Sequence, residues 1–337
     1  MELSENEVVA LNFANKLARI SSERHFAKLR DSTPLGGCLF HYTSVSGLHG
    51  IVADNCLHAS AAYFLNDSSE LEYGRRILDK VLDEWEVDNP EARDNVTAEL
   101  VRDLRSKINH EDGHEALVQS VHLACFCQRD NVLSQWRAYG QAGGYSMGFP
   151  VEHGSIRNLT PEAPSYTALL TRVEYEEEAQ IRKCKEILEL VLPIVDDPTL
   201  KRILRTTNAF TYHGPMSTYE FILKAMQEML LDEILAFKDK AFKEEDEWRL
   251  IVRPRLFLLQ GTDDRGKTPT KIYFRPSRGL LVPYLKLVAP KGKLPFVSIR
   301  SGPSVDRARA EASVRLLLRE YGFKDVAFSG SEIPVLM

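Results

Sequence analysis

The order of helical and strand-like segments is the feature of this sequence that most constrains its fold. A capping-box pattern at Ser4 and Glu7, followed by apolar residues at helical spacing, predicts a leading amphipathic helix over residues 4–30. Further helices are predicted over residues 68–85, 90–108 and 304–321, and almost throughout 177–240. The strand-like segments are residues 38–43, 57–60, 121–127, 144–149, 168–176, 247–252, 271–274, 280–288, 296–299 and 326–328. Because strands cluster late and do not alternate regularly with helices, we expect an α+β fold with a mostly antiparallel sheet.

This distribution divides the chain into three expected parts. Residues 1–37 would form an N-terminal helical extension, and residues 38–176 and 241–337 together an α+β core. Residues 177–240 would be a large helical insertion between strands of that core. A chain of 337 residues has the length of two domains, or of one domain with such an insertion.

Composition excludes several protein classes. Hydrophobic residues make up 44% and charged residues 27% of the chain, which is ordinary globular usage, and the net charge is −5. No apolar run approaches the roughly 18 residues that would span a bilayer, and the acidic start of the chain is unlike a signal peptide. Five cysteines in a chain of this length are typical of reduced thiols. We therefore expect a cytoplasmic protein with no membrane partner.

Charge is unevenly distributed. Between Ile251 and Lys293, ten Lys and Arg face only two acidic residues, Asp263 and Asp264, a local balance of +8. Such a basic region suggests a face that meets phosphate or another anion. A solvated sheet edge guarded by basic residues is the alternative, and the composition leaves both open.

Two apparent motifs are weak on inspection. Residues 261–268 fit the P-loop pattern, but Pro269 and a strand-like run follow directly, so no helix begins there and a hairpin turn is the better interpretation. His122, Cys125 and Cys127 form an H-x-x-C-x-C cluster, yet no second cysteine pair completes a zinc site. Buried thiols are the favoured interpretation, and no metal is predicted.

The segment from Phe242 to Val252 is more informative. On a strand, Glu245, Glu247 and Arg249 would project from one face, while Trp248, Leu250 and Val252 would point into the core. Two carboxylates beside an arginine can bind a sugar hydroxyl and stabilise developing positive charge. An exposed ladder of charges, worth about 0–1 kcal/mol, is the alternative, and the spacing alone favours it.

A set of short motifs, each weak alone, resembles a known family. They are His41-Tyr42-Thr43, Phe64 to Asp67, Cys125 to Cys127, Ser134 to Gly140, Gly144 to Phe149, Glu245 to Leu250, and Ser331 to Pro334. Together they are similar to an uncharacterised bacterial family, the domain of unknown function 2971 (DUF2971). Its layout distantly resembles ADP-ribosyltransferases, notably the DarT-like toxins that modify DNA, which implies a sheet core of ADP-ribosyltransferase type.

The resemblance implies roles for particular residues. His41 and Thr43 would hold the adenosine or ribose side of NAD, Tyr63 or Phe64 would pack on nicotinamide, and Glu247 would bind the nicotinamide ribose. Glu245 and Glu247 also look like the paired glutamates of arginine-directed transferases, and the resemblance does not decide which is catalytic. The full expected set is Glu245, Glu247 and Arg249 for catalysis, and His41, Tyr42, Thr43, Tyr63, Phe64, Asn66, Asp67, Trp136 and Tyr139 for NAD.

The expected function follows from that set. We expect an ADP-ribosyltransferase-like enzyme that uses NAD as a substrate and modifies a nucleic acid or a protein, in toxin or phage-defence biology. A non-catalytic module that senses a nucleotide or polyanion is the second hypothesis. A nucleic-acid-processing enzyme is the third, although the sequence offers no convincing metal-binding carboxylates or His pair for it.

Overall fold

The computed structural model describes most of the chain. The described residues are 4–31, 37–64, 69–90, 95–109, 121–140, 143–151, 156, 158–162, 166–204, 208–211, 214–254, 271–277, 279–303 and 306–334. Asn66, Asp67 and the P-loop-like pattern of residues 261–268 lie outside them. Among the described residues, no helix is long and apolar enough to cross a membrane.

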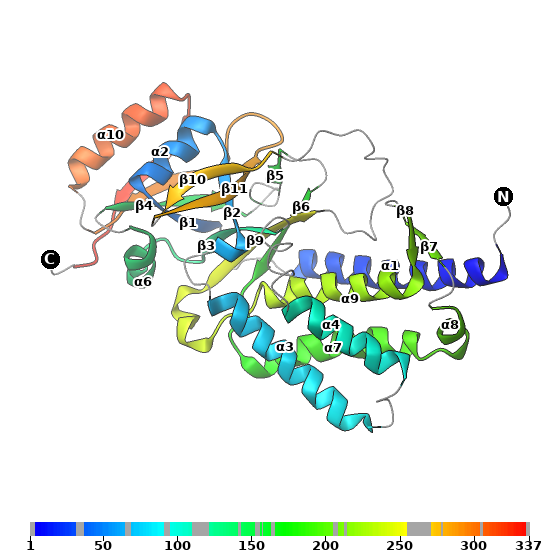
Figure 1. The fold of residues 1–337 in the computed structure, drawn as a ribbon. Helices are drawn as coiled ribbons and strands as arrows, with labels where there is room; N and C mark the ends of the chain where they lie inside the picture. The colour runs from blue at the N-terminus through cyan, green and yellow to red at the C-terminus, as the bar shows by residue number, and fades with distance from the viewer. Residues whose placement is uncertain are drawn as a thin grey trace.

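A large, mostly antiparallel sheet forms the centre of the molecule (Figure 1), which confirms the predicted α+β class. Its main path has the order β10-β11-β2-β3-β1-β4-β12-β13, and β9, β6 and β5 pair beside this path. Only the pair β12–β13 is parallel among the described strand pairs. The strands are β1 (Cys38–Ser44), β2 (Leu57–Ala61), β3 (His122–Cys127), β4 (Gly144–Pro150), β5 (Thr160–Pro161), β6 (Tyr166–Arg172), β9 (Glu247–Pro254), β10 (Tyr273–Ser277), β11 (Leu280–Val288), β12 (Ser298–Ser301) and β13 (Ala327–Gly330).

The sheet divides at β3. One edge of β3 pairs with β9 along the whole strand, from His122 to Cys127. The other edge is shared, because Leu123 pairs with Ser60 of β2 and Cys127 pairs with Phe40 of β1. Between these two contacts, this edge of β3 pairs with neither β1 nor β2, so side chains lie beside its backbone instead of another strand.

One face of the sheet is covered by α2 (Val45–Asp54) and α10 (Arg307–Glu320), as Figure 1 shows. Ile51 of α2 and Val314 of α10 share a buried core with Met147, Trp248 and Leu250 of the sheet. Burying these side chains supplies about 1.5–3 kcal/mol each, so this face is closed by apolar packing.

Six further helices of the described residues gather in one group beside the opposite face (Figure 1). They are α1 (Glu5–Asp31), α3 (Ser69–Asp88), α4 (Val96–Asn109), α7 (Glu177–Val195), α8 (Pro198–Ile203) and α9 (Thr218–Ile234). Leu17, Leu82, Leu104, Ile187 and Met226, from five of these helices, belong to one buried core. The helices of residues 177–240 therefore share their core with α1, α3 and α4, and a short hairpin, β7 (Asn208–Thr211) with β8 (Gly214–Ser217), interrupts them.

Local sequence signals set several helix ends. Ser4 and Glu7 form the predicted capping contacts, with the Glu7 amide donating to Ser4 Oγ at 3.3 Å and the Ser4 amide donating to the Glu7 carboxylate at 2.7 Å. A second capping box joins Ser217 and Glu220 at the start of α9. Helix α2 ends at Asn55, whose φ of 51° turns the chain sharply into β2.

Candidate functional site

Strand β9 has the two faces that its sequence predicts. Trp248, Leu250 and Val252 lie in the core under α2 and α10, while Glu247 and Arg249 point to the opposite face. The prediction was wrong for Glu245, because it ends a 3-10 helix, η5 (Lys240–Glu245), rather than starting the strand. Asp246 follows with a φ of 42°, so the chain turns between the two glutamates and strand alternation does not relate them.

Five charged side chains meet at this face of β9. The Lys238 ammonium donates to Glu245 at 2.7 Å and to Glu247 at 3.0 Å, and lies 2.9 Å from Glu70 of α3. Arg249 donates through Nε to Glu247 at 2.9 Å, and its Nη2 pairs with Glu70. We call Glu70, Lys238, Glu245, Glu247 and Arg249 the carboxylate cluster. Three carboxylates face two cations, so the cluster carries one surplus negative charge.

The carboxylate cluster is buried, which makes the exposed-ladder interpretation wrong. The side chains of Lys238, Glu247 and Arg249 are only 4%, 5% and 3% exposed, because the segment after α9 and the start of α3 lie over β9. Glu70 and Glu245 reach further toward solvent, at 12% and 15%. Glu70 and Glu245 are thus the two carboxylates of the cluster that solvent reaches.

The two predicted glutamates have opposite electrostatic character. Burial disfavours the charged form of Glu247, yet Arg249 and Lys238 outweigh it and lower the pKa of this carboxyl from 4.5 to about 2. Burial raises the pKa of Glu245. The positive charge of Lys238 lowers this pKa only in part, because the negative charges of Glu247 and Glu70 raise it further. Glu247 is therefore a permanent anion, whereas Glu245 carries the surplus charge and accepts a proton more readily.

Cys125, Tyr139 and Tyr175 surround the carboxylate cluster. Cys125 lies opposite Arg249 in the β3–β9 register, and burial, with the charge of Glu247 beside it, raises the pKa of its thiol. Burial also raises the pKa of Tyr139, with Cys125 and Glu247 adding to the effect, so this phenol lies next to the cluster. The Glu247 amide donates to the Tyr175 hydroxyl at 2.9 Å, which fixes the start of β9.

A guanidinium occupies the same face of the sheet on the other side of β3. The strand registers from β10 to β9 place Arg275, Ser60, Cys125 and Arg249 on one face. Arg275 donates to Ser60 Oγ at 2.9 Å, while its Nε is buried without a hydrogen-bond partner among the described residues. Burial lowers the pKa of Arg275, and no carboxylate of the described residues forms an ion pair with it. An anion is the missing partner of such a group.

His41 lies where the sheet divides, beside the part of β3 that pairs with neither β1 nor β2. Its Nδ1 lies 2.9 Å from the Cys125 carbonyl oxygen, and its ring packs against Phe126. Burial, together with the charge of Arg275, lowers the pKa of His41 to about 4, so the ring is neutral at physiological pH. His41 thus lies near Arg275 and contacts the β3 backbone at Cys125.

The other expected NAD-binding residues separate into two groups. Tyr42 and Trp136 are core residues, with their rings 4.8 Å apart and edge to face. The Tyr42 hydroxyl donates to the Arg129 carbonyl and accepts from the Val132 amide, so both side chains serve packing. Thr43 continues β1 opposite Tyr145 of β4.

Tyr63 and Phe64 lie in the short helix η1 (Ala62–Phe64) that follows β2. The centres of their rings are 5.6 Å apart with the rings edge to face, and Tyr63 is exposed. This position is compatible with contact to a ligand ring. Asn66 and Asp67, the other half of the motif, lie outside the described residues.

The H-x-x-C-x-C cluster does not gather its three side chains. Residues three apart on a strand point to opposite faces, so His122 projects away from Cys125 and Cys127. His122 is fully buried, and neither of its ring nitrogens has a hydrogen-bond partner among the described residues.

Sequence reasoning missed Lys238, Glu70 and Arg275. Lys238 and Glu70 reach the cluster through tertiary contacts from the ends of α9 and α3, and no local spacing signals that. Arg275 had a usable signal, because it lies two residues after Tyr273 in a strand of the basic segment and therefore shares the face of that tyrosine.

Comparison with known proteins gives one match. Residues 135–250 match the family described as Protein of unknown function (DUF2971), which confirms the resemblance to that family. No curated protein and no solved structure matches the chain. The matched residues include Tyr139, Lys238, Glu245, Glu247 and Arg249, so most of the carboxylate cluster lies inside the family region.

Proposed function

Since the family matched by residues 135–250 is described only as of unknown function, we propose an activity from the charges of the site itself. The chain is an ADP-ribosyltransferase-like enzyme. It cleaves NAD at the nicotinamide–ribose bond and transfers ADP-ribose to a macromolecular acceptor, a nucleic acid or a protein. The observation that carries this proposal is the surplus negative charge of the carboxylate cluster, which is held in a largely dry site.

NAD matches the charges on this face of the sheet. Its nicotinamide ring is cationic and its pyrophosphate is anionic. The carboxylate cluster lacks one positive charge, and Arg275 lacks an anion among the described residues. Both lie on the same face, on either side of Cys125. In the proposed complex the pyrophosphate pairs with Arg275, and the nicotinamide ribose lies against Glu245.

The chemical step uses the same charges. The bond from C1′ of the ribose to the nicotinamide nitrogen breaks, and its electron pair leaves with nicotinamide, which becomes neutral. Positive charge then develops on the ribose as an oxocarbenium-like state, and fixed carboxylates stabilise it. The acceptor nucleophile bonds to C1′ and gives up its proton to Glu245.

Glu245 and Glu247 have different roles in the proposed reaction, and these follow from their pKa values. A base that accepts a proton works best when its pKa is raised, as it is for Glu245. Glu247 stays ionised and holds Lys238 and Arg249 in place. Tyr139 lies beside the cluster, where its ring can pack on the substrate. Tyr63, exposed after β2, is the second candidate for contact with nicotinamide.

The first experiment measures NAD consumption by purified protein, alone and with added DNA, RNA or protein. Glu245→Gln should lower turnover by about 10²–10³-fold, because it removes a general base. The matched control is Glu244→Gln, which changes an exposed neighbouring carboxylate and should leave turnover unchanged. Arg275→Gln should raise KM for NAD by about 10- to 100-fold with a smaller effect on kcat, since it removes a charged hydrogen bond to phosphate.

A nucleotide-sensing module is the second candidate, favoured by the guanidinium of Arg275, which forms no ion pair with a carboxylate of the described residues. The enzyme and the sensing module are distinguished by whether binding depends on the positive charge of the nicotinamide ring. Binding of NAD should exceed that of NADH, which has the same phosphates and an uncharged ring, if the carboxylate cluster contacts the nicotinamide ribose. Equal affinity for the two, with no NAD turnover by any acceptor, would refute the enzyme and leave the module. If the acceptor is a nucleic acid, expression should be toxic to host cells and Glu245→Gln should relieve the toxicity.

A further inference from the structure

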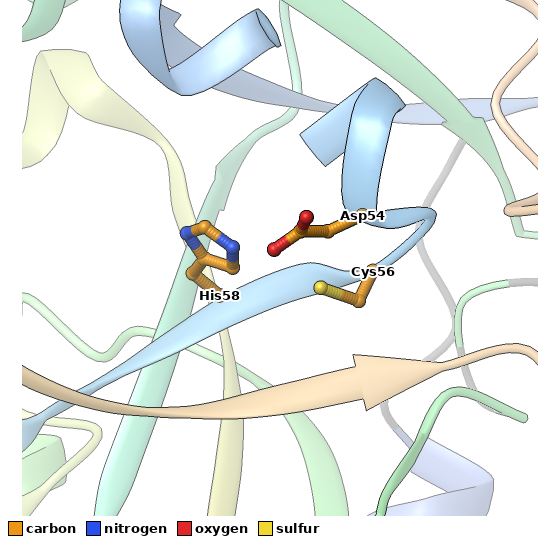
Figure 2. Close-up of side chains that lie close together, drawn as sticks. All are labelled: Asp54, Cys56 and His58. Atoms are coloured by element: carbon orange, nitrogen blue, oxygen red, sulfur yellow. The ribbon is translucent and has the colours of Figure 1, made fainter. Parts of the chain in front are cut away.

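Three potential metal ligands meet where α2 turns into β2. Asp54 is the last residue of α2, Cys56 follows the turn, and His58 is the second residue of β2. The left-handed conformation of Asn55 makes this turn, and its side chain anchors it by accepting from the Leu294 amide at 2.9 Å. Figure 2 shows the carboxylate, the thiol and the imidazole converging on one point beside the turn.

The distances among these side chains suit a small metal ion. One potential ligand atom from each of Asp54, Cys56 and His58 lies within 4.8 Å of the other two. A tetrahedral zinc site, with bonds of about 2.0–2.3 Å, needs ligand atoms about 3.3–3.6 Å apart. The ligand atoms therefore have to approach one another by at most about 1.5 Å. Asp54 is exposed at the end of its helix, so its side chain can rotate to supply this movement.

A cation already occupies the neighbourhood of these ligands. The Lys286 ammonium lies 3.0 Å from the Asp54 carboxylate, and its charge also acts on the Cys56 thiol. The same ammonium lies 4.7 Å from the centre of the Tyr273 ring, on the adjacent strand. Lys286 thus keeps a favourable cation–π partner when another cation takes its place at Asp54.

Within the described part of the chain, the histidine has a ring nitrogen without a hydrogen-bond partner and the cysteine is a free thiol. The Nε2 atom of His58 is buried and has no hydrogen-bond partner among the described residues. Cys56 is fully buried and is a free thiol. A buried nitrogen that lacks a partner costs free energy, and a metal bond removes that cost.

We propose that Asp54, Cys56 and His58 bind one Zn²⁺ ion at the junction of α2 and β2. A thiolate, an imidazole and a carboxylate together select zinc over magnesium or calcium, which prefer oxygen ligands alone. On binding, the Cys56 thiol releases its proton to solvent and the sulfur bonds to the metal. Water takes the fourth position, which is the arrangement of zinc sites that keep one position open.

Co²⁺ is the probe for this site, because its bonds to thiolate sulfur give a near-ultraviolet charge-transfer band. The full chain, stripped of metal with a chelator, is titrated with Co²⁺ and the bound metal is then displaced with Zn²⁺. One equivalent of Co²⁺ should give the band, and one equivalent of Zn²⁺ should abolish it. Lys286→Met should raise the affinity for Co²⁺ at least several-fold, because it removes the competing ammonium.

Ligand variants make the test specific. Cys56→Ser should abolish the charge-transfer band, and His58→Gln should weaken binding by more than the roughly 10- to 100-fold typical of residues that only support a ligand. Cys38→Ser, which removes another cysteine of the same sheet, should leave the titration unchanged. Circular dichroism checks that each variant folds. The proposal is overturned if neither the wild type nor Lys286→Met binds Co²⁺ with a thiolate band, or if folded Cys56→Ser retains it.

Discussion

Replacing Glu247 and Glu245 by glutamine, one at a time, should have opposite effects on stability. Each change removes one negative charge from the carboxylate cluster and keeps the shape of the side chain. The net charge of the cluster becomes zero in both variants, so net charge alone predicts the same outcome for both. The pKa directions predict different outcomes, because a lowered pKa means that folding favours the ionised form and a raised pKa means that it does not.

The magnitude for Glu247 follows from the loss of a buried ion pair. Arg249 and Lys238 lower the pKa of this carboxyl, so its ionised form stabilises the folded protein at neutral pH. Breaking a buried ion pair by removing one partner costs about 3–5 kcal/mol. Glu247→Gln should therefore lower Tm by about 6–10 °C, at roughly 2 °C per kcal/mol for a chain of this size.

The pH dependence has a definite sign. The contribution of Glu247 is present in full above the unfolded pKa of 4.5 and is lost as the pH falls toward about 2. The stability of the wild type should fall over this range more steeply than that of Glu247→Gln. For Glu245 the sign reverses, since its raised pKa means that ionisation near neutral pH costs stability. Glu245→Gln should leave Tm at pH 7 unchanged or higher, while NAD turnover is lost.

Urea denaturation at pH 7 and at several pH values down to 3 measures both effects. Glu244→Gln, which alters an exposed glutamate beside them, is the control and should behave as the wild type. Equal destabilisation by Glu245→Gln and Glu247→Gln would refute the division of roles between the two carboxylates. A Glu247→Gln protein with unchanged stability at every pH would contradict the buried cluster as a whole.

Three further substitutions test the packing that supports the site. Tyr42→Phe should cost about 1–3 kcal/mol, because the Val132 amide then loses its acceptor in a buried position; thermal unfolding measures this, and NAD binding should not change. Gly74→Ala should destabilise the protein, since the added methyl group would lie only 3.0 Å from the Ile234 carbonyl oxygen and also collide with that side chain, whereas Gly50→Ala, with its nearest neighbour at 3.6 Å, should have little effect on Tm or raise it.

The sequence predicted the fold class and one face of the site because those features are local or periodic. Alternation along β9 placed Trp248, Leu250 and Val252 in the core, and Glu247 and Arg249 on the other face. Strand alternation failed at Glu245, because one residue with a positive φ, Asp246, separates it from the strand. A single backbone reversal of this kind leaves no periodic signal in a sequence.

Burial and partners were not predictable in the same way. The sequence favoured an exposed charge ladder because nothing local marks Lys238 or Glu70 as partners of β9. They arrive from the ends of α9 and α3, which only the packing of the helical group determines. The proximity of Asp54, Cys56 and His58 was not predicted for a related reason. Asp54 belongs to a helix and His58 to a strand, and the turn at Asn55 brings them near Cys56.

The charges on the free face of the sheet argue for a ligand with two opposite ends. Arg275 and the carboxylate cluster do not neutralise each other, because β3 lies between them and each is partly buried. A polyanion would pair with Arg275 but would meet repulsion from the cluster, and a simple cation would leave Arg275 without a partner. An uncompensated charge in a partly buried site costs free energy, so one molecule that carries both opposite charges would stabilise the surplus charge of the carboxylate cluster and the guanidinium of Arg275 together. A dinucleotide with a cationic base and an anionic pyrophosphate is such a molecule, and this is the argument for proposing NAD as the substrate.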